Sequence, residues 1–352
     1  TGYTTNEAKD VYTFTLRDNA RWSDGNQVTA HDFVYAWRRL ADPATASPYS
    51  WFAEIMALEN VGAVMSGESP PEALGVRALD NLTLEVRLTA SLPYFAAMTT
   101  HASTYPTPQW TVKTFGDDWT KPGNIVGNGA YVLTEHIPNE TATRERNSLY
   151  WNNDATIINK VVTLIMNDEN TDFTRWEAGE TDRGAIPSGQ YPRLKAQYPE
   201  EAISFPRLCT YYYTFNLSPS GQDALQDVRV RQALSYALDR SVVTDKILQG
   251  GQIQAFTFTP GATAGFEVPA VAFGQMTQDE RNAKAKELMA EAGYGSDNPL
   301  SVEIMYNTSE AHKKIAIAVQ QMWKETLGVK ATLANQEWKT FLKTRGGQNF
   351  DI

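Results

Sequence analysis

The sequence predicts an α/β protein with more than one domain, on three observations. Its 352 residues exceed what one compact core usually holds, so two or three domains are expected. Residues 300–333 have the pattern strand, helix, strand, which is typical of a parallel βαβ unit. Residues 76–88 instead predict an antiparallel hairpin with one polar face, which indicates an α+β lobe in the first part of the chain.

The βαβ unit is the most informative part of the sequence. Its strands are expected at 302–306 and 329–333, and Ser309 is a suitable N-cap for the connecting helix. Leu327-Gly328 ends that helix, whose apolar stripe consists of Ile315, Val319, Met322 and Trp323. Ligands of such sheets gather at the carboxyl ends of the strands, beside the helix N-termini. His312-Lys313-Lys314 falls there, so the sequence indicates an anion site, with a solvated basic turn as the equal alternative.

The N-terminal part also has regular patterns. A strand is expected at 12–17. Thr29 and Asp32 have the spacing of a capping box for a helix that Asp42-Pro43 ends, and His31 should lie on its solvent side. The Pro-rich stretch 104–108 is a candidate crossover between domains.

Later segments give further expected elements. The turn Gly127-Asn128-Gly129 lacks the Lys-Ser/Thr of a phosphate loop and is expected to lead into a strand at 131–133. A strand is expected at 161–166, and helices at 172–179 and 227–238. A second helix should run from Asp239 to Gly250-Gly251, and Thr277 with Glu280 should cap a helix at 281–292.

Residues 208–217 are rich in aromatic and β-branched residues and predict a strand. Alternation would place Cys209, Tyr211, Tyr213 and Phe215 on a core face and Tyr212 on a polar face suited to a wet cleft. The alternative is an edge strand with a tyrosine in solvent.

Net charge and hydrophobic content disfavour some classes of partner. The net charge of −10 disfavours nucleic acid and anionic membranes as partners, since both attract basic surfaces. No run approaches the length of a membrane helix, so no membrane insertion is expected. The chain has neither a starting Met nor a signal-like segment, and its one cysteine suggests a missing partner; we therefore expect a fragment incomplete at both ends.

No pattern of catalytic chemistry stands out. The four histidines have no metal-type spacing with one another or with carboxylates, so neither a metal site nor a cofactor is expected. There is no nucleophile elbow, and a pair of cleft carboxylates is the only enzymatic alternative left open. We therefore expect a protein that is not an enzyme.

Several motifs, in order along the chain, resemble the family 5 solute-binding proteins of ABC importers, in their oligopeptide-binding and murein-tripeptide-binding branches. They are Trp22-Ser23-Asp24-Gly25, Asn128-Gly129-Ala130-Tyr131, Tyr150-Trp151-Asn152-Asn153, Asp227-Val228-Arg229-Val230-Arg231, Tyr306-Asn307-Thr308-Ser309 and Asn335-Gln336-Glu337-Trp338. The resemblance implies a three-lobed fold of the periplasmic binding protein type II kind, with mixed sheets flanked by helices. It implies an extra lobe at 1–108, part of the first binding lobe at 109–208 and part of the second at 209–352.

The same resemblance implies the binding residues and the partners. Positions matching the family's peptide cleft are Tyr49, His101, Glu169, Cys209, Tyr212, Asn307, His312, Trp338 and Arg345. His312 and Arg345 match residues that can meet the peptide's C-terminal carboxylate, and Cys209 matches half of a disulfide whose partner lies beyond Ile352. The implied partners are a short peptide and ABC permease subunits, and the implied state is a monomer in the periplasm, exported with a signal peptide absent from this chain.

Two positions depart from the oligopeptide-binding pattern. Leu248 stands where that branch has a lysine, and Thr214 where it has an acidic residue. A murein-tripeptide or haem-peptide binder therefore stays open as an alternative. A carboxylate-dependent hydrolase and a chaperone-like binder of unfolded chains are the alternatives from other classes.

Overall fold

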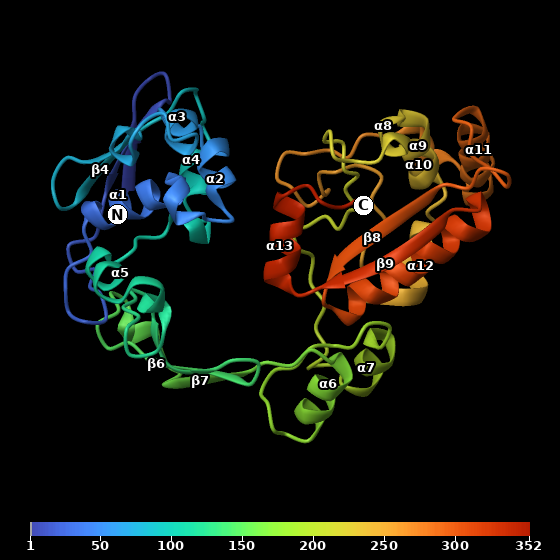
Figure 1. Cartoon of the computed structure of the whole chain (residues 1–352). Helices are drawn as coiled ribbons and strands as arrows, with labels where there is room; N and C mark the ends of the chain where they lie inside the picture. The colour runs from blue at the N-terminus through green and yellow to red at the C-terminus, as the bar shows by residue number, and fades with distance from the viewer. Residues whose placement is uncertain (1) are drawn as a thin grey trace. The chain divides into compact units, whose positions relative to one another are not determined.

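The computed structural model describes residues 2–352. The chain forms two compact units, Thr1–Ile165 and Met166–Ile352, which are described one at a time below. Figure 1 shows the elements of each unit along the chain.

Unit 1 begins with an antiparallel four-stranded sheet in the order β1-β2-β4-β3. Helices cover this sheet, and α1 contacts both β3 and β4 (Figure 1). The predicted hairpin at 76–88 is confirmed as β3 and β4. The elements are β1 (Gly2–Thr5), β2 (Val11–Thr15), α1 (Ala30–Ala41), η1 (Pro43–Thr45), α2 (Ser50–Ile55), α3 (Val61–Met65), η2 (Pro71–Ala73), β3 (Val76–Ala78), β4 (Thr83–Arg87) and α4 (Phe95–Met98).

Helix α1 begins where the capping pattern predicts. The buried Asp32 carboxylate accepts hydrogen bonds from the Thr29 backbone N–H at 2.8 Å and from Trp22 Nε1 at 3.2 Å. His31 is exposed, as expected, and Asp42 is the C-cap before Pro43. The opposite face of α1 packs into a core that contains Tyr12, Trp37 and Phe95.

The rest of unit 1 contains a second, antiparallel sheet in the order β5-β6-β7. Strands β5 and β7 confirm the strands expected near 131 and 161. The elements are η3 (Ala102–Thr104), α5 (Gln109–Phe115), η4 (Gly116–Thr120), β5 (Tyr131–Ile137), β6 (Thr141–Arg146), η5 (Asn153–Ala155) and β7 (Lys160–Leu164).

Unit 2 contains the βαβ unit as predicted. Strands β8 and β9 are parallel, paired from Ser301↔Lys330 to Asn307↔Gln336, and α12 connects them. The elements are α6 (Glu169–Glu177), α7 (Tyr191–Gln197), α8 (Asp223–Gln226), α9 (Val228–Tyr236), the π-helix η6 (Val242–Leu248), α10 (Ala272–Gln275), α11 (Gln278–Glu291), β8 (Ser301–Asn307), α12 (Glu310–Leu327), β9 (Lys330–Gln336) and α13 (Trp338–Gly346).

The core of unit 2 forms between α12 and the helices α9 and α11. Trp323 is 1% exposed, and its indole N–H donates to the Leu234 carbonyl at 2.9 Å. Ile315 and Val319 lie in the same core, as the apolar stripe predicts, while Met322 is only half-buried. The capping box of Thr277 and Glu280 is present at the start of α11.

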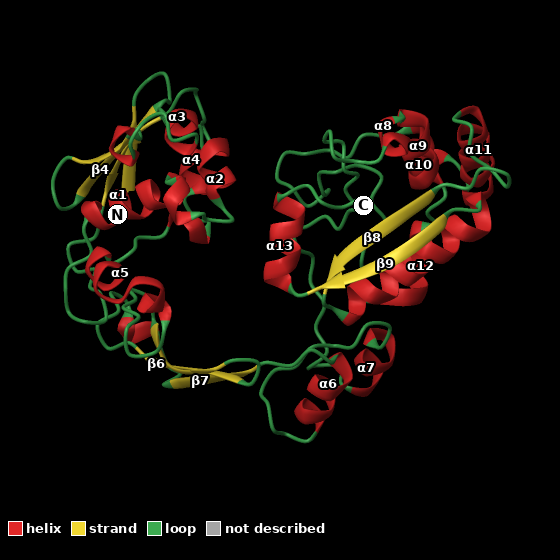
Figure 2. Ribbon diagram, viewed as in Figure 1, coloured by secondary structure: helices red, strands yellow, loops and turns green. Residues whose placement is uncertain are grey.

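One secondary-structure prediction is wrong, and a second is right in position but not in helix type. Residues 208–217 form no strand; Figure 2 shows this part of the chain as loop. Within this segment, only Asn216 forms a backbone hydrogen bond with another extended segment: its N–H donates to the Asp351 carbonyl at 2.9 Å. A strand needs such bonds along its whole length. The helix expected from Asp239 is a π-helix at Val242–Leu248, and it ends in Gln249, which has φ +50°.

The end of the chain is extended but is also not a strand. Ile352 exchanges hydrogen bonds with β8, since its carbonyl accepts from Met305 N–H at 2.8 Å and its N–H donates to the Glu303 carbonyl at 3.2 Å. The boundary between the compact units lies at 165/166, whereas the sequence placed lobe boundaries at 108 and 208. The three-lobe division stays a prediction.

Candidate functional site

The carboxyl ends of β8 and β9 bring several predicted site residues to one edge of the sheet. Asn307 is the last residue of β8, and His312 lies in the first turn of α12. Trp338 begins α13 directly after β9. Because parallel strands end at the same edge, one sheet positions all three residues.

His312 is held in place by two neighbours. Its Nδ1 lies 2.9 Å from Asn307 Oδ1, and its ring centroid lies 5.4 Å from that of Tyr211. Burial lowers the pKa of His312 from its ordinary value, while hydrogen bonding to Asn307 acts in the opposite direction. The imidazole is therefore mainly neutral at pH 7 and can accept or donate one hydrogen bond at its free nitrogen.

The two lysines beside His312 already have partners. Lys313 lies 3.8 Å from Glu310, and Lys314 Nζ donates to the Ser188 carbonyl at 3.3 Å. Ser309 caps the helix by accepting from the His312 N–H at 3.4 Å. The anion site at this helix N-terminus stays a prediction, and these contacts restrict it to His312 and the remaining N–H groups.

The 209–216 segment differs from the predicted two-faced strand in its first half. Cys209 and Tyr211 were expected in the core, but both are exposed. Without ladder pairing, nothing imposes strand alternation on these residues. Further along, Tyr213 and Phe215 do pack against the core of unit 2. Tyr212 is 57% exposed, as expected of a cleft residue, and its ring contacts Phe258 at 5.0 Å.

Glu169 begins α6 and binds a neighbouring turn. Its Oε2 accepts from the Ser188 N–H at 2.9 Å, and its Oε1 accepts from the Ser188 hydroxyl at 3.2 Å. Both carboxylate oxygens are therefore oriented by one residue. No pattern in the sequence marks Ser188, because the contact joins positions 19 residues apart through loop geometry.

Helix α13 presents Trp338 and Arg345. Trp338 is 47% exposed and stacks on Phe341 with centroids 5.7 Å apart. The Glu337 carboxylate caps the helix by accepting from the Lys339 N–H at 2.9 Å. Arg345 is exposed in the last turn, roughly 10 Å further along the helix axis at the usual rise per residue.

Tyr49 and His101 lie together in unit 1. Their ring centroids are 5.6 Å apart, and His101 stacks on Phe52 at 4.1 Å. His101 Nδ1 lies 2.8 Å from the Ser103 hydroxyl, which orients the imidazole. These two site residues therefore form a local aromatic group in unit 1, whereas the other seven belong to unit 2.

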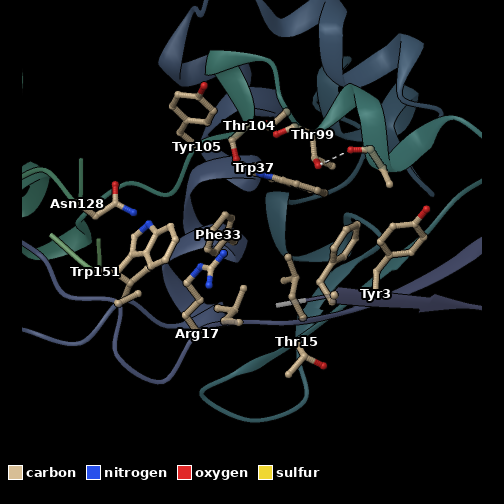
Figure 3. Close-up of a pocket in the computed structure, with 17 residues that line it drawn as sticks. Tyr3, Thr15, Arg17, Phe33, Trp37, Thr99, Thr104, Tyr105, Asn128 and Trp151 are labelled. Carbon is tan, nitrogen blue, oxygen red and sulfur yellow. Dashed lines mark hydrogen bonds between the residues drawn. The ribbon is translucent and has the colours of Figure 1, made fainter. Parts of the chain in front are cut away.

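Unit 1 also contains a pocket of about 450 Å³ that the sequence did not indicate. Figure 3 shows Phe33 and Trp37 on its wall and Arg17 beside Trp151. The Arg17 guanidinium lies 3.7 Å from the Trp151 ring centroid, a cation–π contact. None of the nine predicted site residues lines this pocket.

Two general properties concern the described residues as a whole. No group of three His, Cys, Asp or Glu side chains in residues 2–352 is arranged to hold a metal ion. No helix in this range combines the length and the apolar character that crossing a membrane requires.

Comparison with known proteins gives a consistent result. The model of the bacterial extracellular solute-binding proteins, family 5 Middle, matches residues 1–352. The chain is 46% identical over 350 residues to the periplasmic oligopeptide-binding protein OppA of Salmonella typhimurium, covering 98% of the chain and 64% of that protein. It is also 46% identical over 343 residues to the periplasmic murein peptide-binding protein MppA of Escherichia coli, covering 97% and 63%.

Solved structures show the same relationship. The murein tripeptide-binding protein MppA of Escherichia coli matches with a TM-score of 0.93 at 44% identity, over 99% of this chain and 68% of that one. OppA of Haemophilus influenzae in complex with RPPGFSPFR matches with a TM-score of 0.90 at 40% identity, over 99% and 69%. The chain thus has the α/β fold of these binding proteins, and it spans a little under two thirds of the length of the curated relatives.

Proposed function

The chain belongs to the bacterial extracellular solute-binding proteins of family 5, and from this premise we propose that it captures short peptides for an ABC importer. The observation that supports this most is the sheet edge of unit 2. There an oriented, neutral His312, its partner Asn307 and the exposed Trp338 are positioned by two parallel strands and the helices that follow them. These groups offer hydrogen bonds and an aromatic surface but no nucleophile with an activating base.

The proposed ligand is recognised by its backbone and its termini. An extended peptide can gain main-chain hydrogen bonds as an added strand does, largely independent of its sequence. Its side chains would occupy roomy pockets in which water adapts to them. We assign peptide contact to Tyr49, His101, Glu169, Cys209, Tyr212, Asn307, His312, Trp338 and Arg345, with His312 and Arg345 nearest the C-terminal carboxylate.

Native mass spectrometry of the complete protein, purified without unfolding, tests the proposal. A binder of unselected peptides should carry a heterogeneous set of bound masses that fragment as peptides of a few residues. A single non-peptide mass, such as a sugar, would contradict it.

A murein-peptide binder is the second candidate, because MppA is as similar to this chain as OppA is. Leu248 and Thr214 also lack the charged groups that the oligopeptide-binding branch carries at these positions. Competition between Ala-Glu-diaminopimelate and trialanine separates the two candidates. A murein-peptide binder should prefer the first by at least tenfold, roughly 1.4 kcal/mol or more, whereas a general binder should not.

We further propose that the protein only binds its ligand and does not cleave it. Incubation with a tetrapeptide followed by mass spectrometry should return the intact peptide, and cleavage products would instead support a carboxylate-dependent hydrolase. The proposed partners are the permease subunits of the importer, and the proposed location is the periplasm, as for the named relatives. The proposed state is a monomer, which light scattering of the purified protein checks.

A further inference from the structure

Residues 187–190 form a turn in unit 2 that contacts three different elements. The Gln190 N–H donates to the Pro187 carbonyl at 2.9 Å, and Gly189 has φ +86°, the combination typical of a type II turn. The turn is half-buried or buried throughout. Its three contacts are with α6, α12 and the π-helix η6.

The first contact is with Glu169. The Ser188 N–H and hydroxyl donate to the two carboxylate oxygens at 2.9 and 3.2 Å. Ser188 therefore fixes both the position and the rotation of a carboxylate assigned to the peptide cleft.

The second contact is with Lys314 in the first part of α12. Its Nζ donates to the Ser188 carbonyl at 3.3 Å, and among the described residues it has no carboxylate partner at ion-pair distance. The positive charge of Lys314 also interacts with Asp168, the N-cap residue of α6. The Thr171 N–H and hydroxyl lower the pKa of Asp168, and the charge of Lys314 adds to this effect.

The third contact is with the end of the π-helix. The Gly189 N–H donates at 2.9 Å to the carbonyl of Leu248, the last residue of η6. A Cβ at position 189 would lie 3.1 Å from the Ile247 carbonyl oxygen, and the φ of +86° also disfavours a side chain, so both the contact and the turn favour glycine. A π-helix is uncommon and frequently marks a functional site.

Two of these three contacts connect residues on opposite sides of the predicted lobe boundary. The predicted boundary between the binding lobes lies at 208/209, so the bonds of Ser188 with Lys314 and of Gly189 with Leu248 both join the first lobe to the second. The Ser204 hydroxyl, which donates to the Gly250 carbonyl at 2.8 Å, adds a third such bond.

We propose that the turn at 187–190 is a latch that holds the two binding lobes together around a bound peptide. Lys314 and Gly189 are then positioning residues that do not contact the peptide. Lys314 acts through its bond with Ser188 and Gly189 through its bond with η6, and both bonds slow the dissociation of the peptide. This inference rests on the proposed function, from which it takes the peptide, and on the lobe boundary that the family resemblance implies. Separating the lobes would break the bonds of Ser188 with Lys314 and of Gly189 with Leu248, whereas the bonds of Ser188 with Glu169 lie within the first lobe and would stay.

The test compares Lys314→Met with Lys324→Met in the complete protein. Lys324 lies on the same helix, is exposed in its last turn, and its replacement changes the net charge equally. Stopped-flow fluorescence with trialanine should show dissociation roughly three- to tenfold faster for Lys314→Met, the effect of losing one half-buried charged hydrogen bond. Association should be unchanged, and Lys324→Met should behave as the parent protein does.

A second ligand separates the latch from direct contact. Trialanine amide lacks the C-terminal carboxylate, so a lysine that binds that carboxylate would matter for trialanine only. The latch predicts the same acceleration for both peptides. Acceleration for trialanine alone, or for neither peptide, would overturn it.

Hydrogen exchange of the trialanine-saturated proteins provides a readout that does not depend on the dissociation rate. The amides of Ile186 and of residues 188–190 should exchange faster in Lys314→Met and in Gly189→Ala than in the parent, and not in Lys324→Met. If the parent protein fails to bind trialanine, the proposed function is wrong. If the parent binds trialanine but these amides exchange at the same rate in the variants, the latch is wrong and the proposed function stands.

Discussion

Among single residues, His312 is the one whose chemistry is most directly testable. Burial lowers its pKa from the ordinary value of a histidine, which favours the neutral imidazole in the free protein at pH 7. A peptide carboxylate nearby would favour the protonated ring and raise this pKa in the complex. Binding should then take up a proton, and the affinity should increase as the pH falls from 7 toward 5, by up to about tenfold for each unit of pKa change.

Calorimetry of trialanine in buffers with different ionisation enthalpies measures this proton uptake. The His312→Gln variant should lose it, whereas His136→Gln, an exposed histidine in β5, should keep it. An affinity for trialanine that does not change with pH would contradict the assignment of His312 to the carboxylate.

Asp32 gives a prediction about stability. Its buried carboxylate accepts from Trp22 Nε1, the Thr29 N–H and the Thr29 hydroxyl, so Asp32→Ala leaves three donors without this partner. We expect a loss of about 2–4 kcal/mol in the free energy of unfolding. Urea denaturation followed by tryptophan fluorescence measures it, with the exposed Asp18→Ala as the control. A loss below roughly 0.5 kcal/mol, the range of ordinary surface substitutions, would show that these bonds contribute little.

The sequence predicted single residues well wherever a local pattern decides their environment. Asp32 follows Thr29 at capping-box spacing, and the structure confirms both bonds of the box. Cys209 and Tyr211 were placed wrongly because their environment depends on strand pairing, and the segment lacks a partner strand. Ser188 was missed because nothing local connects it to Glu169 or Lys314.

At the scale of elements, the βαβ unit organises unit 2, and Trp323 joins its helix to α9. Trp323→Ala would open a cavity and leave the Leu234 carbonyl without its 2.9 Å hydrogen bond. We expect a loss of about 3–5 kcal/mol in the free energy of unfolding. Trp323→Phe keeps most of the ring volume and should lose less than half of that amount. Equal losses for the two variants in urea denaturation would indicate that the hydrogen bond, and not the packing, dominates.

Elements with strong periodicity were predicted almost to the residue. The stripe of Ile315, Val319 and Trp323 specified α12, and Ser309 and Gly328 marked its ends. The π-helix η6 was predicted only as a helix, because the extra residue per turn leaves no mark in such a short sequence. The short strands β1 and β6 were missed, since pairing with neighbours specifies them more than their own residues do.

For the whole molecule, the family resemblance predicted the fold and the family, whereas the local patterns predicted only the fold class. The motifs found along the sequence agree with a family model that matches residues 1–352 and with structural neighbours at TM-scores of 0.93 and 0.90. The local patterns alone predicted an α/β chain with several domains and no metal-type spacing. They could not reveal the proposed peptide-contact residues, because these come from segments far apart in the sequence, as Glu169 and His312 illustrate.

We propose above all that the protein recognises the backbone and termini of short peptides and tolerates their side chains. Isothermal titration of the complete protein with trialanine, trileucine and trilysine measures this tolerance. We predict that all three bind, with affinities within about a hundredfold, or ~2.8 kcal/mol, of one another, and with a negative heat-capacity change from burial of the ligand. The absence of heat with every peptide, together with heat on addition of a sugar or a metal ion, would contradict the claim.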